Sequence, residues 1–278
     1  MESNTSAVFG VPHILQKDVE CFIVDEFTGA EGLVIRTFPS AIPGIVFHHN
    51  EGRPAIEQIT THAGRKFSPP TLFLHGTGSE SSVMCFTKGS YSVTRVIFKP
   101  HALQSLLGIN ALALNEAAVE LDEFSGEHLN QQLMDAASAQ NRIALLTRFL
   151  VASFNPSRRR DELIEESLRL IHHHAGRITV KTLLDDLDIS ERHFERRFSE
   201  TVGMSPLSYI RVKRFNEALR LMQGRKHDTL TEVAYALNFH DQSHFIREVK
   251  TFTGITPKSL SQKMDELFHN QAGYSYSG

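Results

Sequence analysis

The C-terminal part of the chain contains one local pattern twice: a short amphipathic helix, a tight turn and a second helix. The two copies occupy residues 179–203 and 229–254. Ser190 and Asp241 each stand directly before the second helix of a copy, where a short polar side chain can accept a hydrogen bond from the free N–H groups of the first turn. These start signals predict an all-helical domain with two helix-turn-helix motifs.

A longer helix is expected between the two motifs. Ser205 and Pro206 form its start signal, because serine caps a helix and proline fits the first helical position. Gly224 follows the last turn as a stop signal. A helix of this length would connect the two motifs rigidly.

The second helix of each motif has an inward and an outward face. Phe194 and Phe198 are four residues apart, as are Phe245 and Val249, so each pair can face inward. The outward face of one isolated helix would simply be solvated, but two such helices favour contact with DNA, because Arg and Gln are standard readers of base edges and Glu can accept from cytosine. His244 could instead fill a packing position. The predicted DNA-reading residues are Arg192, Glu195 and Arg196 in the first motif, and Gln242, Ser243, His244, Ile246 and Arg247 in the second.

Charge is distributed unevenly along the chain. The net charge is −3, yet residues 158–263 hold 19 of the 29 Lys and Arg residues and only 15 of the 32 Asp and Glu residues. This part is therefore positive and the remainder negative, a division that lets one domain approach phosphate groups.

Residues 162–262 resemble the DNA-binding domain of AraC/XylS-family transcriptional regulators, in which one long helix joins two helix-turn-helix units. The resemblance is carried by SERHFERRF, GMSPLSYI with RFNEALRLM, EVAYALNFHDQSHFIREVK and FTGITPKSL. It implies double-stranded DNA and RNA polymerase as partners. Leu184 stands where the family often has Ala, and Asp188 and Asn238 replace the usual turn glycine, although both tolerate a left-handed turn.

The N-terminal part reads as strands. Short apolar or alternating runs between residues 20 and 98 are separated by Gly, Pro and Ser clusters, which predicts an antiparallel sandwich or barrel. Helical spacing follows after Pro100. The segment VTRVIFKPHALQSLLGINALALNE is similar to the sensor domain of one group of AraC-type regulators, which implies a domain that senses an effector or dimerises.

We therefore predict an α+β chain, with a cupin-like antiparallel β-sandwich or barrel and trailing helices in front of an all-α domain. The run Arg158–Arg160 in its linker could contact phosphate or be solvated. The predicted divisions are 1–154 for a sensor or dimerisation domain, 155–160 for a linker, 161–268 for the DNA-binding domain and 269–278 for a flexible tail.

Two features of the strand-rich part leave alternatives open. His48, His49, His62 and His75 are either ordinary histidines or contributors to a metal site, although their spacing is not that of a tight ligand set. The phenylalanines of the strands form either a plain core or a ligand cavity. These are Phe22, Phe38, Phe47, Phe73, Phe86 and Phe98.

Sequence motifs of common catalytic sites are missing: there is no GxSxG, HExxH, GxGxxG or Walker-type Gly-Lys-Ser. We expect no enzymatic activity, cofactor or metal, and Cys21 and Cys85 show no CxxC spacing. The opening MESNTSAVFG has no basic start followed by a long apolar run, and no stretch reaches about 18 apolar residues, so a cytoplasmic protein without a membrane partner is expected.

The main hypothesis is a DNA-binding transcriptional regulator whose N-terminal domain responds to a small-molecule effector or forms a homodimer. The first alternative is a metal- or ligand-binding β-barrel protein, or an enzyme, with an attached DNA-binding domain. The second alternative is an N-terminal domain that only dimerises.

Overall fold

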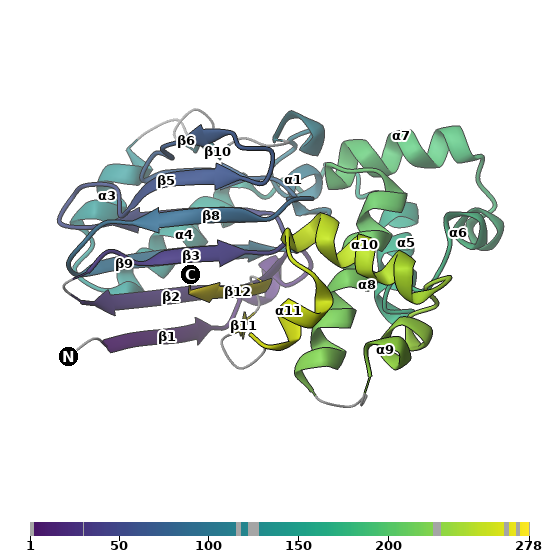
Figure 1. Cartoon of the computed structure of the whole chain (residues 1–278). Helices are drawn as coiled ribbons and strands as arrows, with labels where there is room; N and C mark the ends of the chain where they lie inside the picture. The colour runs from purple at the N-terminus through teal and green to yellow at the C-terminus, as the bar shows by residue number, and fades with distance from the viewer. Residues whose placement is uncertain are drawn as a thin grey trace.

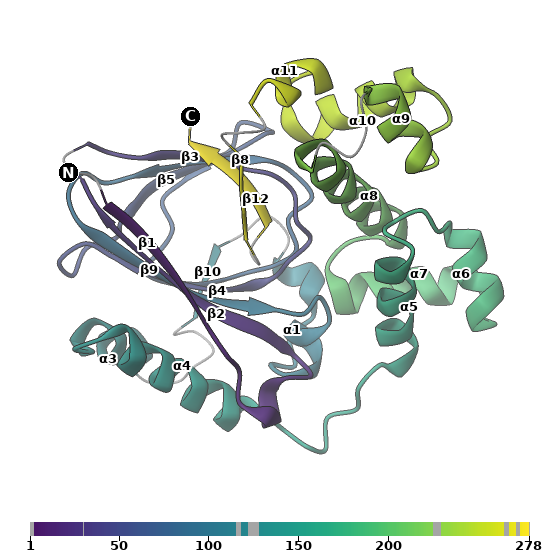
Figure 2. The same cartoon turned by 90° about the horizontal axis from the view of Figure 1, so that it is seen from below.

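A computed structural model describes residues 3–29, 31–114, 118–121, 128–224, 229–263, 267–270 and 273–277. Two antiparallel sheets form one half of the molecule and a group of helices forms the other half (Figure 1). The sheets lie face to face, as the view from below shows (Figure 2). The predicted α+β class, with an antiparallel sandwich followed by a helical domain, is confirmed.

The first sheet carries the core of the N-terminal half on its outer face. Phe22, Phe47 and Phe98 on this face pack against Leu146 and Leu150. These leucines belong to α4 (Ala139–Ser153), which together with α3 (Leu129–Asp135) covers the sheet (Figure 2). The strand order is β1 (Ser3–Phe9), β2 (Val19–Thr28), β9 (Tyr91–Phe98), β4 (Gly44–His49), β7 (Leu72–His75) and β10 (Ala118–Glu120). Short helical segments among the described residues of this half are η1 (His13–Leu15), α1 (Ala102–Ser105) and η2 (Ala111–Leu114).

The second sheet includes the C-terminal end of the chain. Ser275 lies opposite Thr37, so the last strand pairs with an N-terminal strand (Figure 2). The prediction of a flexible tail over residues 269–278 is therefore wrong for its described residues, because their backbone groups pair with the edge of the sheet. The strand order is β11 (Phe268–Asn270), β12 (Gly273–Ser277), β3 (Val34–Thr37), β8 (Ser82–Phe86), β5 (Ile56–Thr61) and β6 (Lys66–Phe67).

The helical half contains the two predicted motifs. Asp188 and Asn238, the residues that replace the usual turn glycines, adopt left-handed φ angles of 47° and 56°. The Asp241 and Ser205 side chains cap their helices as predicted, whereas the Ser190 side chain makes no capping hydrogen bond. The first motif is α6 (Val180–Leu187) with α7 (Glu191–Val202), and the second is α9 (Leu230–Ala236) with α10 (Gln242–Thr253). The remaining helices are α5 (Glu162–His173), the connecting α8 (Pro206–Gln223) and α11 (Pro257–Ser261).

The segment between the two halves is anchored to the N-terminal half. Arg158 donates a hydrogen bond to the carbonyl oxygen of Leu106. Arg160 donates to both carboxylate oxygens of the buried Asp18, over 2.9 and 3.0 Å. Two of the three arginines that we expected to meet phosphate or solvent therefore bind the protein itself, and only Arg159 is exposed.

This anchor should weaken in acid. Burial alone would raise the pKa of Asp18, but His101, Ser105 and the charge of Arg160 together hold it below the ordinary value of 3.8. Because the folded-state pKa is depressed, the stabilisation is fully present above the ordinary value and is lost as the pH falls through the lower folded value.

We expect Asp18→Asn to lower the free energy of unfolding near neutral pH, and the difference from wild type to shrink towards about pH 3. Urea denaturation of both proteins across this pH range measures it. A difference that grows in acid would contradict this account of the Asp18 pKa.

Candidate nucleic-acid interface

The second helix of each motif buries the face that the sequence predicts. Phe194 and Phe198 in α7, and Phe245 and Val249 in α10, are all buried. The rings of Phe194 and Phe198 lie 5.5 Å apart, and that of Phe245 lies 5.2 Å from Phe239 at the motif turn. The prediction of the inward faces is confirmed.

The predicted DNA-reading residues lie on the opposite faces of α7 and α10. His244 is half-buried, and its ring meets the ring of Phe239 edge to face at 5.3 Å, so it also has the packing role weighed above. Ile246 is half-buried as well. Arg196 lies 3.5 Å from Glu200 within its own helix. The fully exposed members of the set are Arg192, Glu195, Arg196, Gln242, Ser243 and Arg247.

Several other arginines of the helical half hold helices together. Arg197 of α7 binds the carboxylate of Asp161 over 2.6 and 3.0 Å. Arg211 of α8 binds that of Glu248 in α10 over 2.7 and 2.8 Å. Within the described residues, Arg192 has no ion-pair partner and remains available to an external anion.

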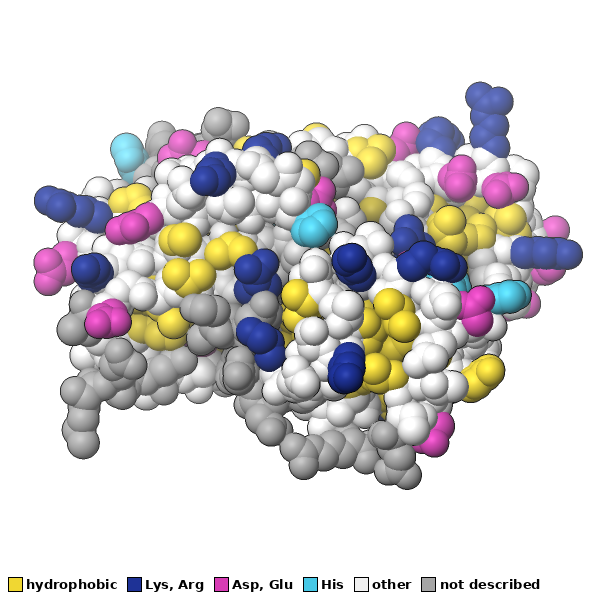
Figure 3. All heavy atoms as spheres, viewed as in Figure 1, with side chains coloured by type: hydrophobic (Ala, Val, Ile, Leu, Met, Phe, Trp, Pro, Cys, Tyr) yellow, Lys and Arg dark blue, Asp and Glu magenta, His cyan; other side chains and the backbone are white. Residues whose placement is uncertain are grey.

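The surface over α10 carries several Lys and Arg side chains beside apolar patches (Figure 3). Our sequence reasoning did not select Tyr235 of α9, whose side chain is the most exposed large apolar one in the described residues at 69%. The helix periodicity of the sequence could have indicated this exposure, because Tyr235 directly follows the buried Val233 and Ala234 and must face away from them.

The N-terminal half contacts the far ends of the two reading helices. Gly203 and Gly254, with φ angles of 89° and 75°, terminate α7 and α10 in the left-handed conformation. Thr77 donates to the carbonyl of Val202 over 2.6 Å, and the ring of His62 lies beside Gly254. The end of α7 is thus hydrogen-bonded to the N-terminal half and the end of α10 lies beside it, away from the predicted DNA-reading residues.

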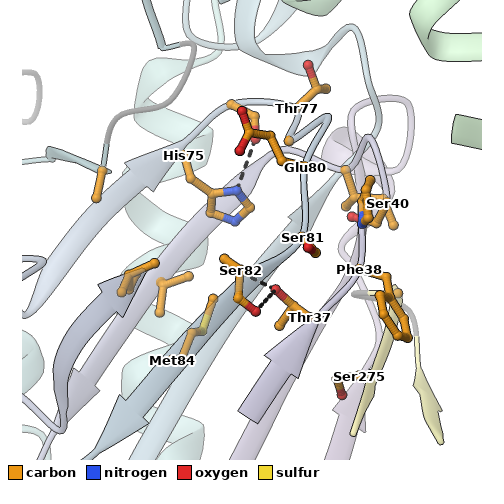
Figure 4. A pocket seen from close by; sticks show the side chains of 18 of the residues that line it. Thr37, Phe38, Ser40, His75, Thr77, Glu80, Ser81, Ser82, Met84 and Ser275 are labelled. Carbon is orange, nitrogen blue, oxygen red and sulfur yellow. Dashed lines mark hydrogen bonds between the residues drawn. The ribbon is translucent and has the colours of Figure 1, made fainter. Parts of the chain in front are cut away.

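A cavity of about 770 Å³ lies between the two sheets and extends to the turn between α7 and α8 (Figure 4). Phe73 and Phe86 line it, whereas Phe22, Phe47 and Phe98 belong to the core under α3 and α4. Phe38 stands beside the cavity and packs edge to face on Phe215 of α8, at 6.0 Å. The phenylalanines therefore divide between the core and the wall of the cavity. Residues of the helical half in its wall are Gly203, Met204, Ser205 and Ser208.

The histidines considered for a metal site are dispersed. Both ring nitrogens of His48 are occupied, one by the N–H groups of Ala55 and Ile56 and the other by the carbonyl of Pro70. His75 faces the cavity and His62 is exposed. The described residues hold no group of three or more His, Cys, Asp and Glu side chains able to bind a metal ion. None of the described helices has the length and apolar character to cross a membrane.

Two family models match the chain. Residues 183–263 match a helix-turn-helix domain, and residues 12–120 match a domain of unknown function (DUF6597). Among curated proteins, the transcriptional regulator YobQ of Bacillus subtilis is 34% identical over 93 residues, which are 33% of this chain and 38% of that protein. The transcriptional activator RhaS of Salmonella schwarzengrund is 25% identical over 145 residues, or 48% of this chain and 50% of that protein. The chain thus spans half or less of these relatives.

Among solved structures, an apo form of ToxT from Vibrio cholerae strain SCE256 is 15% identical, with a TM-score of 0.45 over 87% of this chain and 97% of that one. Together, the fold and the match over residues 183–263 define the C-terminal half as a twin helix-turn-helix domain. This domain is of the AraC/XylS type, so the resemblance noted from its sequence is confirmed.

Proposed function

We propose that the chain is a DNA-binding transcriptional regulator that reads two successive major-groove segments with α7 and α10. The observation that carries this proposal is the pair of reading helices, each with a buried aromatic face and an exposed polar face, joined by one continuous helix. With 18 residues, α8 is about 27 Å long at about 1.5 Å per residue. That length approaches the roughly 34 Å of one turn of DNA.

One protomer should bind a site made of two unlike boxes. The exposed residues differ, with Arg192, Glu195 and Arg196 in one reader and Gln242, Ser243 and Arg247 in the other. His244 and Ile246 are half-buried and would contribute less. Because the two readers lie on one chain, a palindromic site is not required.

Replacing one reading arginine should relax preference in one box only. Arg196→Ala should act in the first box and Arg247→Ala in the second, each costing about 1–3 kcal/mol if the guanidinium contacts a guanine edge. Binding selection from random DNA with the full chain and both variants measures it, with Arg53→Ala, an exposed arginine of the N-terminal half, as control. A symmetric motif, or the same base pairs affected by both variants, would refute the two-reader geometry.

The N-terminal half is proposed to modulate this activity by binding a small-molecule effector in the cavity between the sheets. Its wall contains Gly203 and Ser205, which connect α7 to α8, so a ligand there contacts the segment that sets the relative placement of the readers. This contact favours the effector over a domain that only dimerises. We further propose that the protein is cytoplasmic and has no enzymatic activity. Its proposed protein partners are RNA polymerase and, in a homodimer, a second copy of the chain.

A further inference from the structure

The cavity between the sheets contains an internal ion pair. Asp25 on β2 and Arg95 on the neighbouring β9 both line it, and Arg95 donates a hydrogen bond to the Asp25 carboxylate. The two side chains are only 10% and 23% exposed. The charge of Arg95 is therefore already balanced inside the protein.

The guanidinium of Arg95 still has an unused donor. Its Nε atom is buried and has no hydrogen-bond partner within the described residues. A buried donor left unpaired is destabilising, so an acceptor atom in the cavity would relieve it. A neutral oxygen is sufficient for this purpose.

His75 adds an acceptor and no charge. Burial, with a smaller effect of nearby Arg95, lowers the pKa of His75 below its ordinary value, against a hydrogen bond to Gly76 that raises it. Nδ1 lies 3.1 Å from the carbonyl oxygen of Gly76 and must be the donor there, which leaves Nε2 as an acceptor. A Cβ at position 44 would lie 3.1 Å from Nε2, so Gly44 makes room for the ring.

The remaining polar groups are acidic or neutral. The hydroxyls of Thr37 and Ser82 lie 2.8 Å apart on the second sheet, whereas His75 belongs to the first sheet, and Glu80 stands near His75 (Figure 4). Among the described lining residues, the carboxylates of Asp25 and Glu80 outnumber the one cation, Arg95. A ligand carboxylate would lose its hydration without gaining an unpaired cation, and a ligand ammonium would meet an Asp25 carboxylate already engaged by Arg95.

We infer that the cavity selects an uncharged, mainly apolar molecule that carries a hydroxyl or carbonyl oxygen. This inference rests on the proposed effector role of the cavity and specifies its ligand class. The volume of about 770 Å³ is within the range of small-molecule sites. A densely hydroxylated molecule is disfavoured, because the lining is dominated by apolar side chains such as Phe27, Phe73 and Phe86.

Three probes with one chain length and different charges test the inference: decan-1-ol, decanoate and decylamine. Calorimetric titration of the full chain at neutral pH should show decan-1-ol binding at least about tenfold more tightly than the other two. A preference for decanoate or decylamine would overturn the inference and leave the cavity as a ligand site. If none of the three probes binds, the proposal that the cavity is an effector site fails as well. The proposal that the chain is a DNA-binding regulator is tested separately, by the binding selection from random DNA.

Changing the internal pair should reduce the selectivity against decanoate. Asp25→Asn removes the carboxylate that balances Arg95, so decanoate should gain about tenfold or more in affinity and decan-1-ol should change little. The matched control is Glu57→Gln, which removes an exposed carboxylate from β5 outside the cavity and should alter neither affinity. Unchanged selectivity in Asp25→Asn would overturn the inference.

A second variant covers the case in which Asp25→Asn does not fold, as judged by circular dichroism. Glu80 is only partly buried, and its carboxylate accepts a hydrogen bond from the N–H of Ala63 over 3.1 Å, which a glutamine oxygen can also accept. Glu80→Gln should therefore fold and raise decanoate affinity a few-fold. No gain in decanoate affinity would count against the charge argument.

Discussion

Phe245→Ala should lower the free energy of unfolding of the helical half by about 3–5 kcal/mol, and Phe194→Ala should have a similar effect. Both side chains are 0% exposed in the core of the helical half, where Phe245 contacts Phe239 at the motif turn and Phe194 contacts Phe198 of its own helix. Removing either ring deletes its burial and leaves a cavity that the rigid helices fill only partly. Urea denaturation followed by circular dichroism measures the change.

The control for this prediction is Gln242→Ala, which changes an exposed residue of α10. It should stay within about 0.5 kcal/mol of the wild type. If the phenylalanine variants denature like the wild type while Gln242→Ala collapses the domain, the inward and outward faces have been assigned backwards.

The helical half was the more predictable part because its signals are local. Asp241 and Ser205 sit within one turn of the N–H groups that they cap, and the spacing of Phe245 and Val249 is set by the helix itself. Ser190 shows the limit, since its position begins α7 but its side chain makes no cap. A residue type at a boundary therefore predicts the helix start better than the individual hydrogen bond.

The sheets were predicted only where a strand has an apolar run. The apolar or alternating runs between residues 20 and 98 correspond to β2, β3, β4, β7, β8 and β9, whereas the mostly polar β5 (Ile56–Thr61) was not recognised. Strand pairing is non-local, so the sequence could not divide the phenylalanines between cavity and core. For the same reason, the pairing of Ser275 with Thr37 had no signal in the tail itself.

The residues of the candidate site were predictable from the sequence, but the ion pairs that occupy other arginines were not. Arg192, Gln242 and Arg247 follow from helix periodicity alone and are exposed as expected, while their contact with DNA stays a prediction. The ion pair between Arg160 and Asp18 joins residues 142 positions apart in the sequence, and no local sequence pattern predicts it. Charge counting therefore overstated the cations available to DNA, since several of them bind the protein's own carboxylates.

The two partners of the ion pair between α8 and α10 should differ in the cost of their removal. Glu248 is 7% exposed, whereas Arg211 is 40% exposed. Arg211→Met would leave a carboxylate buried without its two hydrogen bonds, and we expect a loss of about 3 kcal/mol in the free energy of unfolding. Glu248→Gln keeps an acceptor oxygen and leaves an arginine that can turn towards water, so its loss should be about 1 kcal/mol.

This asymmetry also bears on the second reader, because the pair fixes α10 against the helix that connects both motifs. Arg220→Met is the control on the same helix: its partner Glu217 is 20% exposed, against 7% for Glu248, so the change should cost less than Arg211→Met. Urea denaturation of the three variants gives the order. If Glu248→Gln proves as costly as Arg211→Met, desolvation of the carboxylate is not what makes the pair important. If Arg211→Met is the costlier change, Arg211 serves chiefly to keep the carboxylate of Glu248 paired where α10 packs against α8.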